Sequence, residues 1–405
     1  MSHIINFWKD VNKTNLEQQV NCCGCSACEN ICPSSAISMC YDDEGFMYPL
    51  LKEEQCLDCG LCLRVCPVVN DCNEYQSYQQ IYAGYSVDQQ IISVSASGGF
   101  ASELSRLIVQ KGGVVFGVQN DDEYVKSRYS MAASLEDLSR FASSKYVQSE
   151  KGRIYTEVKQ KLIEGKLVLF TGLPCDIAAL KLFLRTEYDN LVTCELICMG
   201  VSSYKIAEDY KAWREKKKSA RLVFVNARSK HCGWFVPHLE EHFSDGKKYY
   251  STLYGTYYGH AMLTYNRPSC YECHYRGDVG VADFRIGDFW GVSKKDPFYN
   301  ESGVSCIFVR THKGRTLIKE LGHSGFYLYE VEYNDAADNN MSFNVNKPSK
   351  YVELRHRFLL EYQRKGLVSA CWNTANLGFL IKYLIPLKYA MQLKHLYHSI
   401  IDKQK

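Results

Sequence analysis

Apolar residues recur along most of the chain with the spacing of buried strands and amphipathic helices. A strand at Ile81–Tyr85 is followed by a small-residue loop at Ser93–Gly99. Phe100–Gln110 then repeats apolar residues with helical period, and Val114–Val118 is a β-branched run typical of a buried strand. The order strand, loop, helix, strand predicts an α/β architecture with a mostly parallel sheet.

The same order continues further along the chain. Helical periodicity marks Arg153–Glu164 and Pro174–Leu184, and runs of strand length occupy Leu167–Thr171 and Leu191–Ile197. The stretch His238–Tyr250 predicts a hairpin with Asp245-Gly246 as its turn. These elements extend the predicted α/β region well past the middle of the chain.

Different patterns flank this region. On its N-terminal side, Asp42–Gly45 reads as a turn and Phe46–Leu51 as a strand. On its C-terminal side, residues 350–405 are helical and carry ten Lys or Arg against three acidic residues, which predicts a surface or partner-facing tail. We therefore expect three parts: a ferredoxin-type domain at residues 15–75, an α/β domain at 80–345 and a basic helical tail at 350–405.

Two copies of one cysteine pattern lie near the N-terminus. Each copy has three cysteines two residues apart, then a fourth after three residues, then proline; the copies run from Cys22 to Pro33 and from Cys56 to Pro67. This is the bacterial ferredoxin run, in which the fourth cysteine of each copy ligates the other cluster. We therefore predict two [4Fe-4S] clusters, the first held by Cys22, Cys25, Cys28 and Cys66, and the second by Cys56, Cys59, Cys62 and Cys32.

Disulfides and zinc are the alternatives for these eight cysteines. Residues 1–14 have no apolar signal-peptide core, so an oxidising compartment is not indicated. Zinc sites commonly use CxxC pairs without a third cysteine in step or a proline after a fourth. Three further cysteines, Cys23, Cys40 and Cys72, fall outside the repeat, and we interpret them as small buried apolar groups.

Composition indicates a globular protein of two or three domains. The 405 residues include 46% hydrophobic and 23% charged residues, and the 19 cysteines favour a reducing compartment and metal ligation. The longest apolar stretch, Leu377–Leu393, is interrupted by Lys382, Pro386 and Lys388 and is too broken for a membrane span. These features predict a cytoplasmic protein.

Charge is distributed unevenly although the net charge is only +3. Residues 14–75 contain ten acidic and two basic residues, so this region carries about −8 and the remainder about +11. An acidic face suits a basic one-electron partner protein, and a solvated acidic surface is the alternative. Nothing in the sequence suggests nucleic-acid binding.

A second group of polar residues surrounds the strand ends of the α/β region. Ser95–Gly99 joins a strand to a helix, where free backbone N–H groups suit the pyrophosphate of a flavin, although helix capping is the simpler interpretation. Ser144–Ser149 adds a cation and an aromatic ring, and Thr171-Gly172 ends a buried strand, where ligands gather in open α/β sheets. No GxGxxG follows a strand, so a Rossmann site is not supported. Lys145 and Arg228 are candidates for binding anions, with surface salt bridges as the alternative.

A third group of thiols lies in the second half of the chain. Cys270 and Cys273 form one CxxC pair, which needs two more thiolates to hold a cubane. Cys175 and Cys198 follow predicted strands and would share a rim with that pair. Cys194 competes with Cys198, but it lies inside an apolar strand, where burial is the simpler interpretation.

These segments carry a resemblance to a known family. SASGGF (95–100), SSKYVQS (143–149), TGLPCDIAALK (171–181), CELICMGVSS (194–203), RPSCYEC (267–273) and ADFRIGDFWG (282–291) resemble the family of the coenzyme F420 hydrogenase/dehydrogenase beta subunit, in its bacterial form with an N-terminal two-cluster domain. The resemblance implies FAD in the α/β domain and a third [4Fe-4S] cluster beside it. Carried over by position, the cluster ligands are Cys175, Cys198, Cys270 and Cys273, and the flavin is lined by Ser97, Gly98, Gly99, Lys145, Tyr146, Gln148 and Ser149.

The combined interpretation is a flavin-dependent iron–sulfur oxidoreductase. A flavin exchanges two electrons as hydride and clusters carry single electrons, so the pair converts between the two. We expect electrons to pass between a one-electron partner and a hydride substrate, F420-like or other, with no nucleophile–base pair in evidence. The alternative is an electron-transfer adaptor subunit without a substrate of its own.

Overall fold

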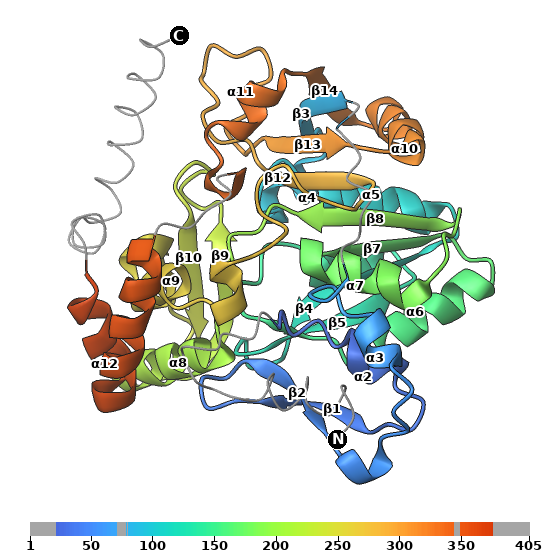
Figure 1. Ribbon diagram of the computed structural model, residues 1–405. Helices are drawn as coiled ribbons and strands as arrows, with labels where there is room; N and C mark the ends of the chain where they lie inside the picture. Colours follow the sequence, from blue (N-terminus) through green and yellow to red (C-terminus); the bar gives the residue numbers. More distant parts are fainter. Residues whose placement is uncertain (1–21, 71–77, 79, 344–348, 376–405) are drawn as a thin grey trace.

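The computed structural model describes residues 22–70, 78, 80–343 and 349–375, and its centre is one large mixed sheet (Figure 1). The strand order is β14-β3-β13-β12-β8-β7-β4-β5-β6. The strands span Gln80–Ser86 (β3), Val114–Asn120 (β4), Ser127–Ala132 (β5), Ser149–Glu150 (β6), Val168–Gly172 (β7), Leu191–Leu196 (β8), Phe284–Asp288 (β12), Ser305–Val309 (β13) and Phe326–Glu330 (β14).

The sheet is parallel at its centre and antiparallel toward one edge. Strands β12, β8, β7 and β4 pair in parallel, and β5 pairs in parallel with β6. Strands β13, β3 and β14 add antiparallel pairs, as does β5 against β4. The prediction of a mostly parallel sheet therefore holds only for the centre, because the sequence pattern of a buried strand does not reveal its direction.

Helices cover both faces of the large sheet. Alternate residues of β4 point to opposite sides: Val115 packs with α5 (Phe100–Gln110) and α10 (His312–His323), while Val114 and Phe116 pack with α6 and α7. The remaining helices near this sheet span Gln89–Val94 (α4), Ile154–Ile163 (α6), Pro174–Leu184 (α7) and Tyr333–Ala337 (α11), with 3-10 turns at Glu136–Phe141 (η2), Pro268–Tyr271 (η4) and Met341–Phe343 (η5).

A smaller antiparallel sheet, ordered β11-β10-β9, packs beside the large one. It contains Leu222–Ser229 (β9), His238–Phe243 (β10) and Lys248–Thr252 (β11), and it is accompanied by Tyr204–Lys218 (α8), Leu253–Gly255 (η3), Tyr257–Thr264 (α9) and Ser349–Asn373 (α12). The predicted hairpin at 238–250 is confirmed, with Gly246 in the left-handed region at φ 80°.

The predicted basic tail is only partly surface. Helix α12 is interrupted at Gly366, whose φ of 80° is not helical. Phe358, Ala370 and Cys371 of this helix are completely buried in the core that also contains Tyr265 of the connection after α9. The rest of the predicted tail, from residue 376 onward, lies outside the described residues, as do Cys72 and the stretch Leu377–Leu393.

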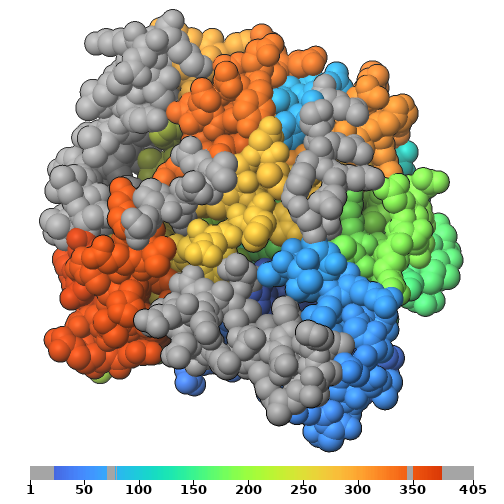
Figure 2. All heavy atoms as spheres, in the orientation of Figure 1, coloured from blue at the N-terminus to red at the C-terminus, as the bar shows by residue number. Residues whose placement is uncertain are grey.

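The two-cluster region forms a lobe against the rest of the molecule (blue in Figure 2). It consists of Ala27–Ile31 (α2), Ile37–Tyr41 (β1), Met47–Leu51 (β2), Glu53–Gln55 (η1) and Leu61–Arg64 (α3), with β1 and β2 antiparallel. The lobe shares its apolar contacts with the large domain: Cys25, Ala27 and Val65 belong to one core with Tyr155 and Ile177. Over the described ranges, no helix is both long and apolar enough to cross a membrane.

Candidate functional site

The second cysteine copy lines a small hollow together with one cysteine of the first copy. Cys56, Cys59 and Cys62 surround it, and the fourth thiol in its wall is Cys32. This is the crossover set predicted from the spacing. Pro33, Ile37 and Leu61 complete the wall, while Cys59 is exposed and Cys56 only half-buried.

The first set lies deeper. Burial raises the pKa of Cys28, and the nearby thiols of Cys22 and Cys66 raise it further. A hydrogen bond to Cys23 and burial raise the pKa of Cys25, with Cys66 and Cys28 again among its neighbours. Thiols influence one another in this way only at short range. The structure thus brings Cys22, Cys25, Cys28 and Cys66 together.

A third group of thiols lies between the lobe and the large domain. Cys175, Cys198, Cys270 and Cys273 line one pocket, and Cys23 of the lobe lies in the same wall. Cys175 is in the first turn of α7, directly after β7, while Cys270 and Cys273 surround the end of η4. Cys194 is fully buried inside β8 and is absent from this pocket, as its apolar surroundings predicted.

Cys23 links the first and third groups. Hydrogen bonds from Cys175 and then Cys25 lower the pKa of Cys23, so its thiol touches one predicted ligand of each set. Our interpretation of Cys23 as a packing residue was therefore incomplete. The same interpretation of Cys40 was wrong, because Cys40 is exposed on β1.

The donor chemistry fits iron–sulfur clusters, since each of the three sets consists of four cysteines. Among the described residues no three Cys, His, Asp or Glu side chains already surround a point as ligands of a single ion would. A cubane stands between its thiolates and holds them apart, so four thiols around a hollow match it better than four thiols at one point.

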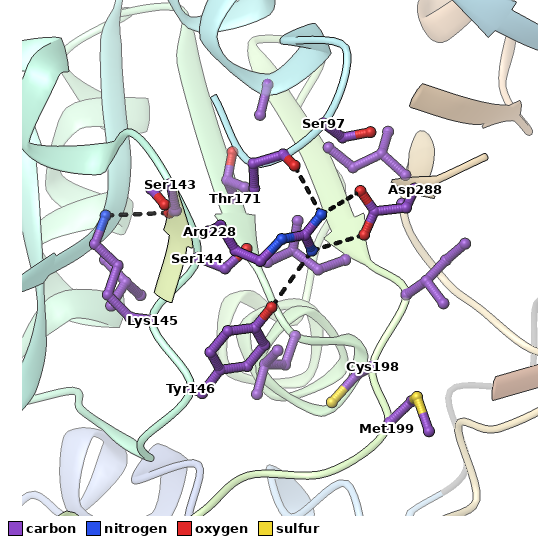
Figure 3. A pocket seen from close by; sticks show the side chains of 18 of the residues that line it. Ser97, Ser143, Ser144, Lys145, Tyr146, Thr171, Cys198, Met199, Arg228 and Asp288 are labelled. Carbon is purple, nitrogen blue, oxygen red and sulfur yellow. Dashed lines mark hydrogen bonds and ion pairs between the residues drawn. The ribbon is translucent and has the colours of Figure 1, made fainter. Parts of the chain in front are cut away.

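Beside the third thiol pocket is a cavity of about 940 Å³. It reaches the first turn of α5, the ends of β7, β8 and β12, and the segment before β6 (Figure 3). Seven of the nine predicted flavin residues line it: Ser97, Gly99, Lys145, Tyr146, Ser149, Thr171 and Gly172.

Gly98 and Gln148 do not line the cavity. A Cβ on Gly98 would meet the backbone nitrogen of Ser305 at 2.7 Å, so this glycine permits close packing of the loop on the sheet. The Gln148 side chain points to the lobe instead, where its Oε1 accepts from the Met47 backbone N–H at 3.1 Å and its Nε2 donates to the Cys23 carbonyl at 3.2 Å. Both residues are structural in this molecule.

The two predicted anion-binding cations are already engaged. Lys145 Nζ donates to the Ala142 carbonyl at 2.6 Å, and burial lowers its pKa to about 7. Arg228 makes a bidentate ion pair with Asp288, with both N–O distances at 2.8 Å, and its Nη1 also donates to the Tyr146 hydroxyl (Figure 3). Arg228 is buried, so the surface salt bridge considered as its alternative is wrong about location but right about pairing.

Comparison with known proteins decides the family. The profile described as the C terminus of the coenzyme F420 hydrogenase/dehydrogenase beta subunit matches residues 165–333, and that of the 4Fe-4S dicluster domain matches residues 21–70. The chain belongs to the family of the coenzyme F420 hydrogenase/dehydrogenase beta subunit. The resemblance inferred from the sequence is thereby confirmed.

Two relatives illustrate the family. The F-type component of the F(420)H(2) dehydrogenase of Methanosarcina mazei is 22% identical over 360 residues, which is 85% of this chain and 90% of the relative. A chain of the F420-reducing [NiFe] hydrogenase complex from Methanosarcina barkeri, solved as a xenon derivative, is 18% identical; the match covers 73% of this chain and 98% of that one, with a TM-score of 0.46. This family member is thus an iron–sulfur electron-transfer subunit.

The structure adds residues that the sequence analysis missed. Arg276 lines both the cavity and the third thiol pocket; it is 5% exposed and makes no ion pair with any described carboxylate. Asp288 and Trp290 also line the cavity, within the quoted segment ADFRIGDFWG, but no role was assigned to them. The position of Arg276 next to CxxC was the one available signal, because an isolated arginine has no recognisable pattern.

Proposed function

We propose that the cavity binds FAD, that Cys175, Cys198, Cys270 and Cys273 hold a third [4Fe-4S] cluster, and that residues 80–345 form the domain carrying both. One observation supports this most strongly: residues 198–201 and Arg276 line the cavity and the thiol pocket at once. A redox cofactor in one hollow and a cluster in the other would be separated by a single layer of residues.

The order of thiol groups supports a continuous path for electrons. The second set is exposed at the outer end of the lobe, and the first set is buried behind it. Cys23 connects the first set to the third, and the third adjoins the cavity. Four redox stations would therefore follow one another from the surface to the interior.

Unsatisfied polar atoms in the cavity wall support a polar occupant. Thr171 Oγ1 and Arg276 Nε are buried and have no hydrogen-bond partner among the described residues. A buried guanidinium without an anion is unfavourable by several kcal/mol, which roughly measures the benefit an anionic ligand group would bring. Helix α5, which is eleven residues long, also turns its first unpaired N–H groups toward the cavity.

A bound flavin would supply hydride exchange, and the clusters single-electron transfer. We infer that the chain itself is an oxidoreductase acting on a hydride-carrying coenzyme, with F420 the first candidate because the relative from Methanosarcina mazei is named for it. The adaptor alternative leaves a cavity of this volume without an occupant. We also propose that a one-electron partner protein docks at the exposed second set.

Cofactor content tests the proposal. Anaerobically purified chain should contain about twelve iron atoms and one FAD, and Cys270→Ser should retain about eight. Thr171→Val keeps the side-chain shape but removes the hydroxyl, and it should weaken FAD binding about fivefold or more, as expected for a hydrogen bond of about 1 kcal/mol. Thr316→Val on the exposed face of α10 is the matched control and should bind FAD as the unmodified chain does.

Two results would contradict the proposal. Eight irons in the unmodified chain, with none lost on Cys270→Ser, would remove the third cluster. Absence of flavin, together with failure of added FAD to bind or of F420 to be reduced, would favour the adaptor function.

A further inference from the structure

A single arginine, Arg267, joins the ligand loops of the first and third thiol sets. It lies three residues before Cys270 and is fully buried. Its Nε donates to the backbone carbonyl of Cys22 at 2.7 Å, and its Nη1 donates to Gln148 Oε1 at 3.0 Å. The guanidinium carbon lies 4.0 Å from the ring centroid of Tyr48, so the cation is stacked as well as hydrogen-bonded.

The charge of Arg267 has no carboxylate partner within the described part of the chain. No described Asp or Glu forms an ion pair with it, and Nη2 is buried without a hydrogen-bond acceptor among those residues. The ionisable groups that act on it are Tyr48, Cys22, Cys23 and Cys270. By contrast Lys151, the other buried cation near these thiols, is compensated by Asp176 at 3.2 Å. Arg267 therefore contributes an unbalanced positive charge directly beside the first set.

The second set has no comparable charge among the described residues. The basic residues of the lobe, Lys52 and Arg64, are exposed, and so are the acidic residues Glu53, Glu54 and Asp58 that accompany the second set. Exposed charges are screened by water and salt, whereas a buried charge acts through a medium of lower effective dielectric. The two halves of a nearly symmetric motif thus experience different electrostatic potentials.

We propose that Arg267 raises the reduction potential of the first cluster above that of the second. Reduction adds one negative charge to a cluster, and a nearby buried cation stabilises the reduced state, because net charge and hydrogen bonding set cluster potentials. An electron that enters at the exposed second cluster then moves to the first, beside the third set and the cavity. This inference rests on the ligand sets proposed above for the two lobe clusters.

The local structure shows that the arginine is built into the site. Gly24, between Cys23 and Cys25, has φ +68°, and a Cβ there would lie 2.9 Å from Arg267 Nη1. Gln148 holds both Arg267 and the Cys23 carbonyl. The ligand loop, the glutamine and the arginine therefore form one packed unit, in which the guanidinium has no room to turn away.

Redox titration monitored by electron paramagnetic resonance tests the proposal on the full chain. In the unmodified protein the first cluster should have the higher midpoint potential. Arg267→Gln should lower that potential relative to the second cluster by at least a tenfold change in the one-electron equilibrium constant, about 59 mV. Arg267→Lys, which keeps the charge but not the fork of donors, should shift it less.

Arg355 provides a matched control. It is also a buried arginine that holds the lobe, through Glu44 and the Asn266 carbonyl, but it does not contact a cluster loop. Arg355→Gln should leave the gap between the two potentials unchanged, even if it lowers stability. An equal shift in Arg355→Gln, or an unchanged gap in iron-replete Arg267→Gln, would overturn the proposal.

A second measurement does not need the arginine variants to fold. Cys59→Ser removes the exposed cluster, and the lobe cluster that survives should be the one with the higher potential; survival of the lower one overturns the proposal. Iron content separates this result from the function proposed above, since eight irons in the unmodified chain would remove the third cluster but leave both lobe clusters to be compared.

Discussion

The two cysteine copies have the same spacing and nearly the same backbone, but their surroundings differ. Gly24 and Asp58 occupy equivalent positions with φ of 68° and 53°, and Ser26 and Gly60 form a second equivalent pair at 65° and 71°. The left-handed conformation therefore belongs to the ligand loop itself. What differs is the space: Gly24 is buried against Arg267 and Gln148, while Asp58 is exposed.

This difference shows how a duplicated motif can acquire two roles. The loop conformation favours glycine or a short polar residue wherever it occurs. Only at position 24 does the neighbouring domain also exclude a Cβ. The first copy is thus embedded between two domains, and the second copy remains open to solvent and to a partner.

Loss of a ligand should affect the two copies most differently. Cys25→Ser removes a ligand inside the core shared with Tyr155 and Ile177, so we expect loss of the first cluster together with a lower melting temperature of the whole chain. Cys59→Ser should lose about four irons and leave the melting of the large domain unchanged. Anaerobic iron analysis and thermal denaturation measure both. Equal destabilisation by the two variants would contradict the comparison.

The equivalent pair Gly24 and Asp58 gives the next largest contrast. Gly24→Ala should destabilise the chain by about 2–5 kcal/mol, the sum of left-handed strain and overpacking against Gln148. Asp58→Gly should change stability by about 0.5 kcal/mol or less, as is usual at an exposed position. Melting temperatures of the two iron-replete variants decide it, and a similar drop in both would show that backbone conformation, rather than space, dominates.

Exposure should also separate the clusters kinetically. Cys59 is exposed and Cys56 half-buried, whereas Cys25 and Cys28 are buried. On exposure to air, about four of the irons should be lost in a faster phase, accompanied by the signal of the second cluster. Loss of all iron in one phase would indicate that the lobe opens as a unit. Cys59→Ser protein should lack the fast phase.

The smallest expected effect is that of salt on electron entry. Glu53, Glu54 and Asp58 are exposed near the second set, and attraction to a basic partner is screened beyond about 8 Å at physiological salt. Reduction by such a partner should slow as salt rises, while reduction of the flavin by a small hydride donor should change far less. Stopped-flow traces of both routes test this, with Glu53→Gln/Glu54→Gln reducing the salt dependence of the first route alone.

Local sequence carried much of the fold. Helix α5 was predicted at the bounds observed, and α7 likewise, because apolar periodicity and the proline at the start of α7 are properties of neighbouring residues. The lobe clusters were equally accessible: the crossover set of Cys32 with Cys56, Cys59 and Cys62 follows from spacing alone and lines one hollow.

Tertiary structure decided what spacing could not. It turned Gln148 from the cavity toward Cys23, paired Arg228 with Asp288, and made Gly98 a packing residue. It also placed Arg267 beside Cys22, which is 245 residues away in the chain. Burial and ion pairing depend on partners that are distant in sequence, so the types of ligand could be read from the chain, whereas the charge that distinguishes the two clusters arises only when the domains pack together.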